Sequence, residues 1–276
     1  MIMNSTRVVM LGTGTPNCEG NRAGAAVAIM VDGVPYIVDC GAGVVRRAAA
    51  AGIAIDRLER LFITHLHSDH TIGLADVILS PAVIGRRGAL EAYGPIGLRN
   101  MTNHVLAAYA EDIQERCEGL EHGNREAYQV EVHEIERGEI YHDEQVRVEA
   151  FRVHHGSWKH AFGFRFETAD RVIVISGDTV PCAELIEKSM GCDILVHEVY
   201  SQVGFAGRNP AWQEYHRHAH TSAVELAEIA RRVQPGLLVL THVLLWGVTE
   251  KELLREIRDG GYDGEVVVGQ DLGVYE

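Results

Sequence analysis

Three histidines and an aspartate fall within six consecutive positions of the stretch FITHLHSDHTIGL, residues 62–74. In an extended segment, residues two apart point to the same side, so His65 and His67 should face one point. Asp69 and His70 follow where the chain turns into a helix, and they can face a neighbouring point. Imidazole with carboxylate suits zinc, and iron, cobalt or manganese are alternatives. The spacing therefore predicts two pairs of metal ligands, and a polar helix cap with surface histidines is the competing interpretation.

Five short apolar runs end in polar side chains of the kinds that bind metals. The runs YIVD, RLFITH, RVIVISGD, DILVHE and LLVLTH end at Asp39, His65, Asp178, His197 with Glu198, and His242. Runs this short and this rich in Val, Ile and Leu predict buried strands. Sites in layered α/β folds gather where strands end, so one rim should carry all these side chains.

Helices are expected between these runs, and strand-then-helix units occur in both halves of the chain. Composition and apolar spacing predict helices over 42–52, 69–80, 102–117, 221–233 and 249–260, and alternation predicts antiparallel strands over 129–153. The helix at 69–80 should stop before Pro81. Because no low-complexity linker interrupts the chain, residues 1–276 are predicted to form a single domain.

The composition argues against several classes of protein. The chain has 276 residues, 46% of them hydrophobic, and a formal net charge of -14, which disfavours a nucleic-acid binder. Five cysteines with no CxxC pair indicate a reducing compartment, so a cytoplasmic location is expected. No apolar span approaches the roughly 20 residues that cross a membrane, so no membrane segment is expected. The start, MIMNSTRVVMLGTGTP, shows no secretory signal.

The motif HLHSDH resembles the HxHxDH signature of the metallo-β-lactamase superfamily. LGTGTP, YIVDCGAG, VHHGSWKHAFGFRF, SGDT and LTH resemble other segments of that superfamily and occur in the expected order. The ribonuclease Z and arylsulfatase-like branch is the most similar. This resemblance implies an α/β protein with an αββα four-layer sandwich and a metal site at one edge.

The same resemblance implies a ligand set for two divalent metal ions, with Zn²⁺ preferred and Mn²⁺, Fe²⁺ or Co²⁺ as alternatives. His65, His67 and one of His154 and His155 would hold the first ion, Asp69, His70 and His242 the second, and Asp178 would bridge them. Strand alternation favours His155, because His154 would point the other way.

Catalytic roles are implied for Asp69, Asp178, Glu198 and His220. A hydroxide bridging the two ions would be the nucleophile, and His220 would donate a proton to the leaving oxygen. Glu198 is predicted to pair with His220, and a purely structural polar pair is the alternative. Asp39 is expected to orient a ligand imidazole or the backbone, and a simple turn aspartate is the alternative.

The substrate is predicted to be a small ester-type molecule: a phosphodiester, a carboxylic ester or lactone, or a sulfate ester. Ribonuclease Z carries a basic arm before SGDT, and the interval RFETADRVIVI is too short for it, so tRNA 3′-end processing is the second hypothesis. The aromatic segment 199–219 could roof a pocket opposite Trp158, with loop packing or a dimer contact as the alternative. Arg208 in this segment could meet an anion, and His216 is expected to be a local surface or pocket residue. Relatives of this kind suggest a homodimer.

Overall fold

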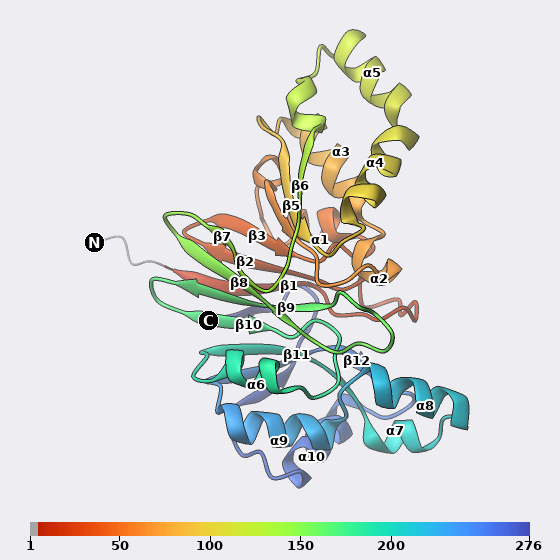
Figure 1. Ribbon diagram of the computed structural model, residues 1–276, viewed down its shortest axis with the longest axis vertical. Coiled ribbons are helices and arrows are strands. Elements are labelled where there is room, and N and C mark those ends of the chain that lie inside the picture. The colour runs from red at the N-terminus through yellow and green to blue at the C-terminus, as the bar shows by residue number, and fades with distance from the viewer. Residues whose placement is uncertain (1–4) are drawn as a thin grey trace. The chain divides into compact units, whose positions relative to one another are not determined.

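The structure is a computed structural model that describes residues 5–276. It divides into two compact units, one formed by the chain up to Ile135 together with Gln270–Glu276, and one formed by Glu136–Gly269 (Figure 1). They are called the first unit and the second unit below. Within residues 5–276, no helix is long and apolar enough to cross a membrane. The predicted absence of a secretory signal rests partly on residues 1–4, which lie outside the described residues.

The first unit contains one mixed sheet of seven strands. Its strands, in the order in which they lie side by side, are β14 (Val274–Tyr275), β1 (Thr6–Gly12), β2 (Ala26–Val31), β3 (Val34–Val38), β4 (Arg60–Phe62), β5 (Leu90–Gly94) and β6 (Val130–Glu134). The pairs from β14 to β3 are antiparallel, and those from β3 to β6 are parallel. The carboxyl ends of β3 and β4 therefore lie at the same edge, where Asp39 and the histidine motif follow.

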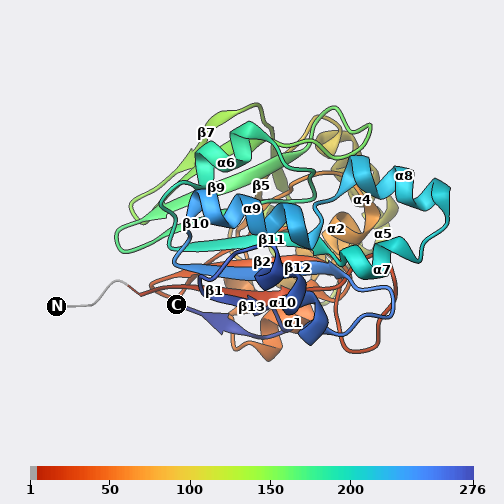
Figure 2. The same cartoon turned by 90° about the horizontal axis from the view of Figure 1, so that it is seen from below.

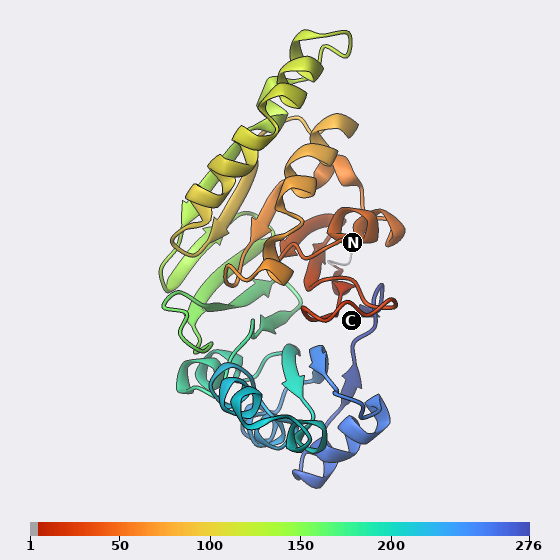
Figure 3. The same ribbon diagram turned by 90° about the vertical axis from the view of Figure 1, so that its right-hand side faces the viewer.

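Helices cover one face of this sheet. They are α1 (Val44–Ala50), α2 (Ser68–Thr71), α3 (Leu74–Ile84), α4 (Leu98–Ala108) and α5 (Ala110–Glu118). Buried side chains of α1 and α3, among them Val45 and Ile78, pack with Ile37 and Leu61 of the sheet. The helix predicted over 102–117 is interrupted at Tyr109, and Figure 3 shows α4 and α5 following one another in nearly one line.

The prediction that a helix stops before Pro81 is wrong, because α3 continues to Ile84. Proline has no N–H to donate to the carbonyl four residues earlier, which is that of Val77. The guanidinium of Arg86 takes this place: Nη1 donates to the Val77 carbonyl at 3.0 Å, and Nη2 donates to the Ile78 carbonyl at 2.9 Å. Arg86 is buried, and the burial lowers its pKa to about 10. A buried cation thus supplies the donor that the proline removes.

The second unit contains another seven-stranded mixed sheet. Its strands, in spatial order, are β13 (Val266–Val268), β12 (Leu237–Leu244), β11 (Ile194–Tyr200), β10 (Val172–Ile175), β9 (Phe162–Thr168), β8 (Val146–Arg152) and β7 (Gly138–His142). The pairs from β7 to β10 are antiparallel, and those from β10 to β13 are parallel. All five strands predicted from apolar runs therefore form: β3, β4, β10, β11 and β12.

Antiparallel pairing was predicted throughout 129–153, and this is confirmed only for β7 and β8. Strand β6 instead pairs in parallel with β5. A parallel pair needs a long crossover, and the helices α4 and α5 between these two strands provide it.

Helices of the second unit fall into two groups. They are α6 (Ala183–Ser189), α7 (Gln202–Ala206), α8 (Pro210–Ala219), α9 (Ala223–Val233) and α10 (Glu250–Asp259). Buried residues of α6, α9 and α10, such as Leu226 and Leu253, pack with Leu195 and Leu238 of the sheet. The helices α7 and α8 leave the end of β11 as a separate pair (Figure 2). They occupy the aromatic segment, in which the sequence did not indicate helices.

Candidate metal centre

The first unit gathers the histidine motif just beyond the end of β4. His65 Nε2 lies 3.0 Å from His67 Nδ1, so the two residues face one side, as their spacing predicts. His70 lies in the short helix α2, and its ring centroid is 4.2 Å from that of His65. Asp69 Oδ2 lies 3.6 Å from His70 Nε2. The structure thus brings these four predicted ligands together within one unit.

Asp39 fixes the orientation of this motif. Its Oδ1 accepts a hydrogen bond from the Thr64 backbone N–H at 2.8 Å, and its Oδ2 lies 2.7 Å from His70 Nδ1. With Nδ1 engaged in this way, the other nitrogen of His70 is the one available to a metal. Asp39 adopts a left-handed φ of 59°, a conformation that non-glycine residues adopt only where their surroundings hold them in it. The predicted orienting contact is present, and the aspartate serves both the imidazole and the backbone.

In the second unit, a second group of buried side chains surrounds Asp178. Its Oδ2 lies 3.6 Å from His242 Nε2 and 3.8 Å from His155 Nε2. His155 Nδ1 lies 2.6 Å from the Ala219 carbonyl and donates to it, which leaves Nε2 facing Asp178. Its neighbour His154 is exposed. The structure thus places His155 beside Asp178, as strand alternation favours.

A β-bulge directs His242 toward this group. The pairing of β11 with β12 runs from Glu198 opposite Thr241 to Val199 opposite Val243, so His242 is the extra residue. Its φ is 44°, which lies in the left-handed region. Bulges of this kind re-aim a side chain, often beside an active site. His242 lies within β12 rather than at its end, which the sequence did not indicate.

The structure places Glu198 beside His220, the residue with which the sequence predicts it to pair. His220 Nδ1 lies 3.4 Å from Glu198 Oε2 and 3.9 Å from Asp178 Oδ2. Glu198 Oε1 accepts hydrogen bonds from the backbone N–H groups of Thr221 at 2.9 Å and Thr179 at 3.2 Å. Burial, and then the charge of Asp178, raise the pKa of Glu198 well above its usual value. Glu198 is therefore rigidly held by the backbone beside His220.

His197 lies on the opposite face of β11 from Glu198, as alternation along a strand requires. It is fully buried, and Nδ1 donates to the Glu198 carbonyl at 2.6 Å. Burial lowers the pKa of His197 to about 4, so this imidazole is neutral at pH 7. It is therefore a structural residue of β11.

The geometry of the second-unit group suits a cation. Asp178, His220 and His242 each offer a ligand atom, and these atoms lie within 4.8 Å of one another. A tetrahedral ion with bonds of about 2.1 Å separates its ligand atoms by about 3.4 Å. The separations of Asp178 Oδ2 from His242 Nε2, 3.6 Å, and from His155 Nε2, 3.8 Å, are near this value and are too long for hydrogen bonds. Buried imidazoles and carboxylate at this spacing are a donor set appropriate to zinc or a similar ion.

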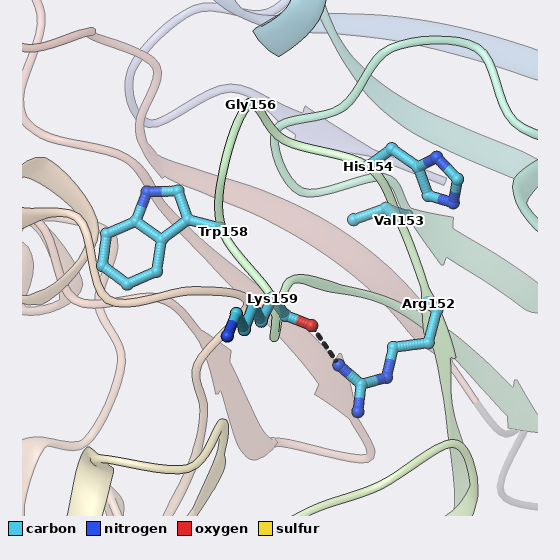
Figure 4. Close-up of a pocket in the computed structure, with 6 residues that line it drawn as sticks. All are labelled: Arg152, Val153, His154, Gly156, Trp158 and Lys159. Atoms are coloured by element: carbon cyan, nitrogen blue, oxygen red, sulfur yellow. Dashed lines mark hydrogen bonds between the residues drawn. The ribbon is translucent and has the colours of Figure 1, made fainter.

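A hollow of about 390 Å³ lies in the loop that carries His155, lined by Arg152, Val153, His154, Gly156, Trp158 and Lys159. Figure 4 shows Trp158 and His154 on different sides of this loop and Arg152 donating to the Lys159 carbonyl, a hydrogen bond of 2.7 Å. The lining has one indole and two cationic side chains, Lys159 and Arg152, and Arg152 also pairs with Glu136 at 2.7 Å. Such a lining can contact an anionic organic molecule.

His216 is the functional candidate that sequence analysis undervalued. It is only 6% exposed, and its ring centroid lies 5.3 Å from that of His220. Burial lowers its pKa to about 4. The spacing of four residues between His216 and His220 could have indicated this contact if the segment had been recognised as a helix.

The glycines of LGTGTP serve close packing. A Cβ on Gly12 would collide with the carbonyl oxygen of Gly24, and one on Gly14 would come within 2.6 Å of the Ala23 carbonyl. These contacts explain why both positions need glycine.

The chain is similar to proteins of one enzyme superfamily. It matches the family model described as anti-Pycsar protein Apyc1 over residues 6–242. A relative named ribonuclease Z, from Mycobacterium sp. (strain KMS), is 38% identical over 244 residues, which cover 86% of this chain and 84% of that protein. Another ribonuclease Z, from Mycobacterium bovis (strain BCG / Pasteur 1173P2), is 32% identical over 275 residues and covers 96% of each chain.

Among solved structures, the metallo-β-lactamase fold protein YhfI from Bacillus subtilis has a TM-score of 0.75 at 18% identity, and the match covers 99% of this chain and 100% of that one. This likeness confirms the predicted α/β sandwich of the metallo-β-lactamase fold. Together with the two relatives, it also confirms the predicted superfamily. The chain therefore belongs to the metallo-β-lactamase superfamily, as a ribonuclease Z-like, metal-dependent hydrolase that matches the family described as anti-Pycsar protein Apyc1.

Proposed function

We propose that this protein is a di-metal hydrolase of small ester-type substrates, with a phosphodiester as the first choice and a carboxylic ester, lactone or sulfate ester as alternatives. The observation that carries the proposal is the buried group around Asp178, whose Oδ2 lies 3.6 Å from His242 Nε2 and 3.8 Å from His155 Nε2. Relatives named ribonuclease Z favour the phosphodiester, because a ribonuclease cleaves that bond.

Seven side chains would hold two divalent ions, with zinc first and manganese, iron or cobalt as alternatives. They are His65, His67 and His155 for one ion, Asp69, His70 and His242 for the other, and Asp178 for both. Membership in the superfamily supports combining these residues in one centre, since its HxHxDH motif acts together with a later aspartate and later histidines.

The bound ions would acidify a water molecule and polarise the ester oxygen. His220 would donate a proton to the leaving oxygen, and Glu198, 3.4 Å from its Nδ1, would hold the imidazole in position. The backbone N–H groups that bind Glu198 keep this carboxylate fixed. Asp69 and Asp178 would balance the charge of the ions. Because Asp178 is buried, bulk water would be kept away from its carboxylate.

A small substrate is supported by the short connection between β9 and β10. Strand β9 ends at Thr168, β10 begins at Val172, and the Thr168 backbone N–H donates to the Arg171 carbonyl at 2.9 Å. A basic RNA-binding arm in this place would need a long insertion. The net charge of -14 also opposes binding of a polyanion.

The second candidate is a ribonuclease Z-like tRNA 3′-processing endoribonuclease. It is favoured by relatives of that name at 38% and 32% identity. Cleavage of a 3′-extended precursor tRNA, resolved on a gel beside hydrolysis of bis(4-nitrophenyl) phosphate, separates the two functions. Efficient turnover of the precursor at nanomolar enzyme would support this candidate and reject the small-substrate proposal.

The metal requirement is tested by chelation and by two substitutions. We expect His65→Ala and Asp178→Ala each to lower kcat/KM for a chromogenic ester by at least about a thousandfold, since each removes a proposed ligand. Elemental analysis of the purified protein should find about two divalent ions per chain, and chelation should abolish turnover until Zn²⁺ is restored. His104→Ala, at an exposed histidine on α4, is the matched control. Full activity in both ligand variants would reject the centre.

Three further expectations stay predictions. A single domain over residues 1–276 would unfold in one transition, and a homodimer would be seen as twice the 30.4 kDa chain mass in light scattering. The cytoplasmic location would be seen by fractionation of cells that express the protein.

A further inference from the structure

Arg208 lies in the link between α7 and α8, with its side chain held against two indole rings. Its Cζ is 5.4 Å from the ring centroid of Trp246 and 5.9 Å from that of Trp212. The Arg208 backbone is also fixed, because its N–H donates to the Phe205 carbonyl at 3.0 Å and its carbonyl accepts from Gln213 Nε2 at 3.0 Å. A guanidinium held on aromatic faces loses little freedom when it binds a ligand.

This cation has no carboxylate partner among the residues that the structure describes, and its Nε is buried without a hydrogen bond. The acid in the α7–α8 segment, Glu214, is engaged with Arg217 at 3.3 Å and with His218 at 3.6 Å. In a chain with 39 acidic and 25 basic residues, a half-buried arginine without an acid is unusual. An external anion would supply the missing acceptor.

His216 joins this arginine to the proposed catalytic group. The centroid of its ring is 4.6 Å from that of Trp246, 5.6 Å from that of Trp212, on which it stacks, and 5.3 Å from that of His220. The Nδ1 of His216 is buried and has no hydrogen-bond partner within residues 5–276. Trp246 adopts a left-handed φ of 47°, a strained conformation that turns its indole into this cluster.

We propose that Arg208, together with His216, binds a second anionic group of the substrate, a phosphate or a carboxylate that is separate from the ester being cleaved. This inference rests on the proposed hydrolase function. The rings of Trp246, Trp212 and His216 connect Arg208 to His220, so we assign its anion to a group apart from the one that receives the His220 proton. The preferred substrate is thus an ester with an anionic arm.

Three aryl phosphodiesters test this inference with one leaving group. They are 4-nitrophenyl phenyl phosphate and its analogues with a carboxylate or a phosphonate at the 4-position of the phenyl arm. We expect the wild-type enzyme to have about a tenfold lower KM for at least one charged-arm substrate, which is the size of one charge-assisted hydrogen bond. Comparison of the two arms distinguishes a carboxylate from a phosphate.

Arg208→Gln should remove this preference through KM, so that KM for the charged-arm substrates approaches KM for the uncharged-arm substrate. Arg208→Lys should restore part of it, which a purely structural role would not do. Arg232→Ala, at an exposed arginine near the end of α9, is the control and should behave as wild type. An equal loss on all three substrates, or no preference in the wild type, would overturn the inference.

A binding measurement keeps this test independent of turnover. The metal-loaded protein would be titrated with three probes, and binding would be followed by tryptophan fluorescence. The singly charged-group probe is phenylphosphonate, and the probes with a second anionic group are 4-carboxyphenylphosphonate and 1,4-phenylenediphosphonate. A lower Kd for a doubly charged probe in the wild type but not in Arg208→Gln supports the site even if no phosphodiester is cleaved, in which case only the proposed function fails. Equal ratios of Kd in both proteins would reject the site.

Discussion

Asp39 shows how one side chain outside the ligand set can control it. It lies at the end of β3 with a left-handed φ of 59°, and it binds both the Thr64 backbone and His70. Asparagine tolerates this backbone conformation but offers one acceptor oxygen in place of two. The orientation of His70 should therefore depend on the carboxylate itself.

We expect Asp39→Asn to weaken metal binding by about 10- to 100-fold, as is usual when the partner of a ligand histidine is changed. Competition with a chromogenic chelator measures this affinity directly. Asp32→Asn is a matched control, because Asp32 also has a positive φ, 48°, but is exposed and outside the motif. Unchanged metal affinity in Asp39→Asn would mean that Asp39 is only a turn residue.

His197 should make stability depend on pH. Its pKa is about 4 in the folded protein and 6.5 in the unfolded chain. Between these values the unfolded chain binds a proton that the folded protein does not, so the stabilisation is complete above pH 6.5 and decreases as pH falls toward 4. The slope is at most about 1.4 kcal/mol per pH unit.

His197→Gln should flatten this dependence, because glutamine can still donate to the Glu198 carbonyl but does not titrate. Urea midpoints at pH 7.5 and pH 5 would be compared for the wild type, this variant and the exposed control His104→Gln. The variant should lose less stability than the wild type over this interval. If the variant lost as much stability as the wild type between pH 7.5 and pH 5, burial of His197 would not be the cause of the pH dependence.

At the scale of elements, α3 continues through a proline because Arg86 replaces a missing donor. Arg86→Leu would leave the carbonyls of Leu58, Val77, Ile78 and Ala127 without this partner. We expect a loss of at least about 3 kcal/mol in the free energy of unfolding, measured in urea, since each buried acceptor costs about 1–3 kcal/mol.

The double variant Arg86→Leu with Pro81→Ala should recover about 1 kcal/mol of this loss, because an alanine at position 81 restores an N–H for the Val77 carbonyl. The exposed neighbour Arg87 provides the control, and Arg87→Leu should change stability by about 0.5 kcal/mol or less. No recovery in the double variant would show that Arg86 does not act as the substitute donor.

The element scale also shows where sequence patterns stop being informative. The run LLVLTH predicts β12, but neither the bulge nor the left-handed φ of His242 follows from residue types. The sequence does not predict the helices α7 and α8 either. Aromatic residues such as Trp212, Tyr215 and His216 are as typical of a loop that covers a pocket as of one face of a helix. Pairing partners and bulges are set by tertiary contacts, which periodicity does not contain.

At the scale of the whole molecule, both units repeat one topology. Each sheet begins with antiparallel strands, β1 to β3 or β7 to β10, and continues with parallel strands to β6 or β13. In each unit, polar residues with chemical roles follow the first parallel strands. Strand-then-helix units occur in both halves of the sequence, but this pattern does not by itself demonstrate the repetition or the division into two compact units.

Part of the proposed ligand set is predictable from the sequence because four of its seven members lie in one short motif. His65, His67, Asp69 and His70 are local to one another, so spacing alone places them together. His155 and Asp178 follow β8 and β10, and His242 lies in β12, so only the resemblance, and not their spacing, predicts that these residues act together. Arg208 and His216 belong to no motif, and only the packing of their rings shows their relation to His220.

The net charge of -14 provides a last test of substrate class. A small anionic ester approaches an acidic protein against repulsion, and salt screens that repulsion over about 8–10 Å at physiological ionic strength. We expect kcat/KM for 4-nitrophenyl phenyl phosphate to rise by about twofold between roughly 20 and 200 mM NaCl. The neutral ester 4-nitrophenyl acetate should show no such change. A nucleic-acid enzyme releases counterions on binding and loses affinity steeply over the same range, so a marked fall in kcat/KM for precursor tRNA, with measurable turnover at low salt, would contradict the small-substrate assignment.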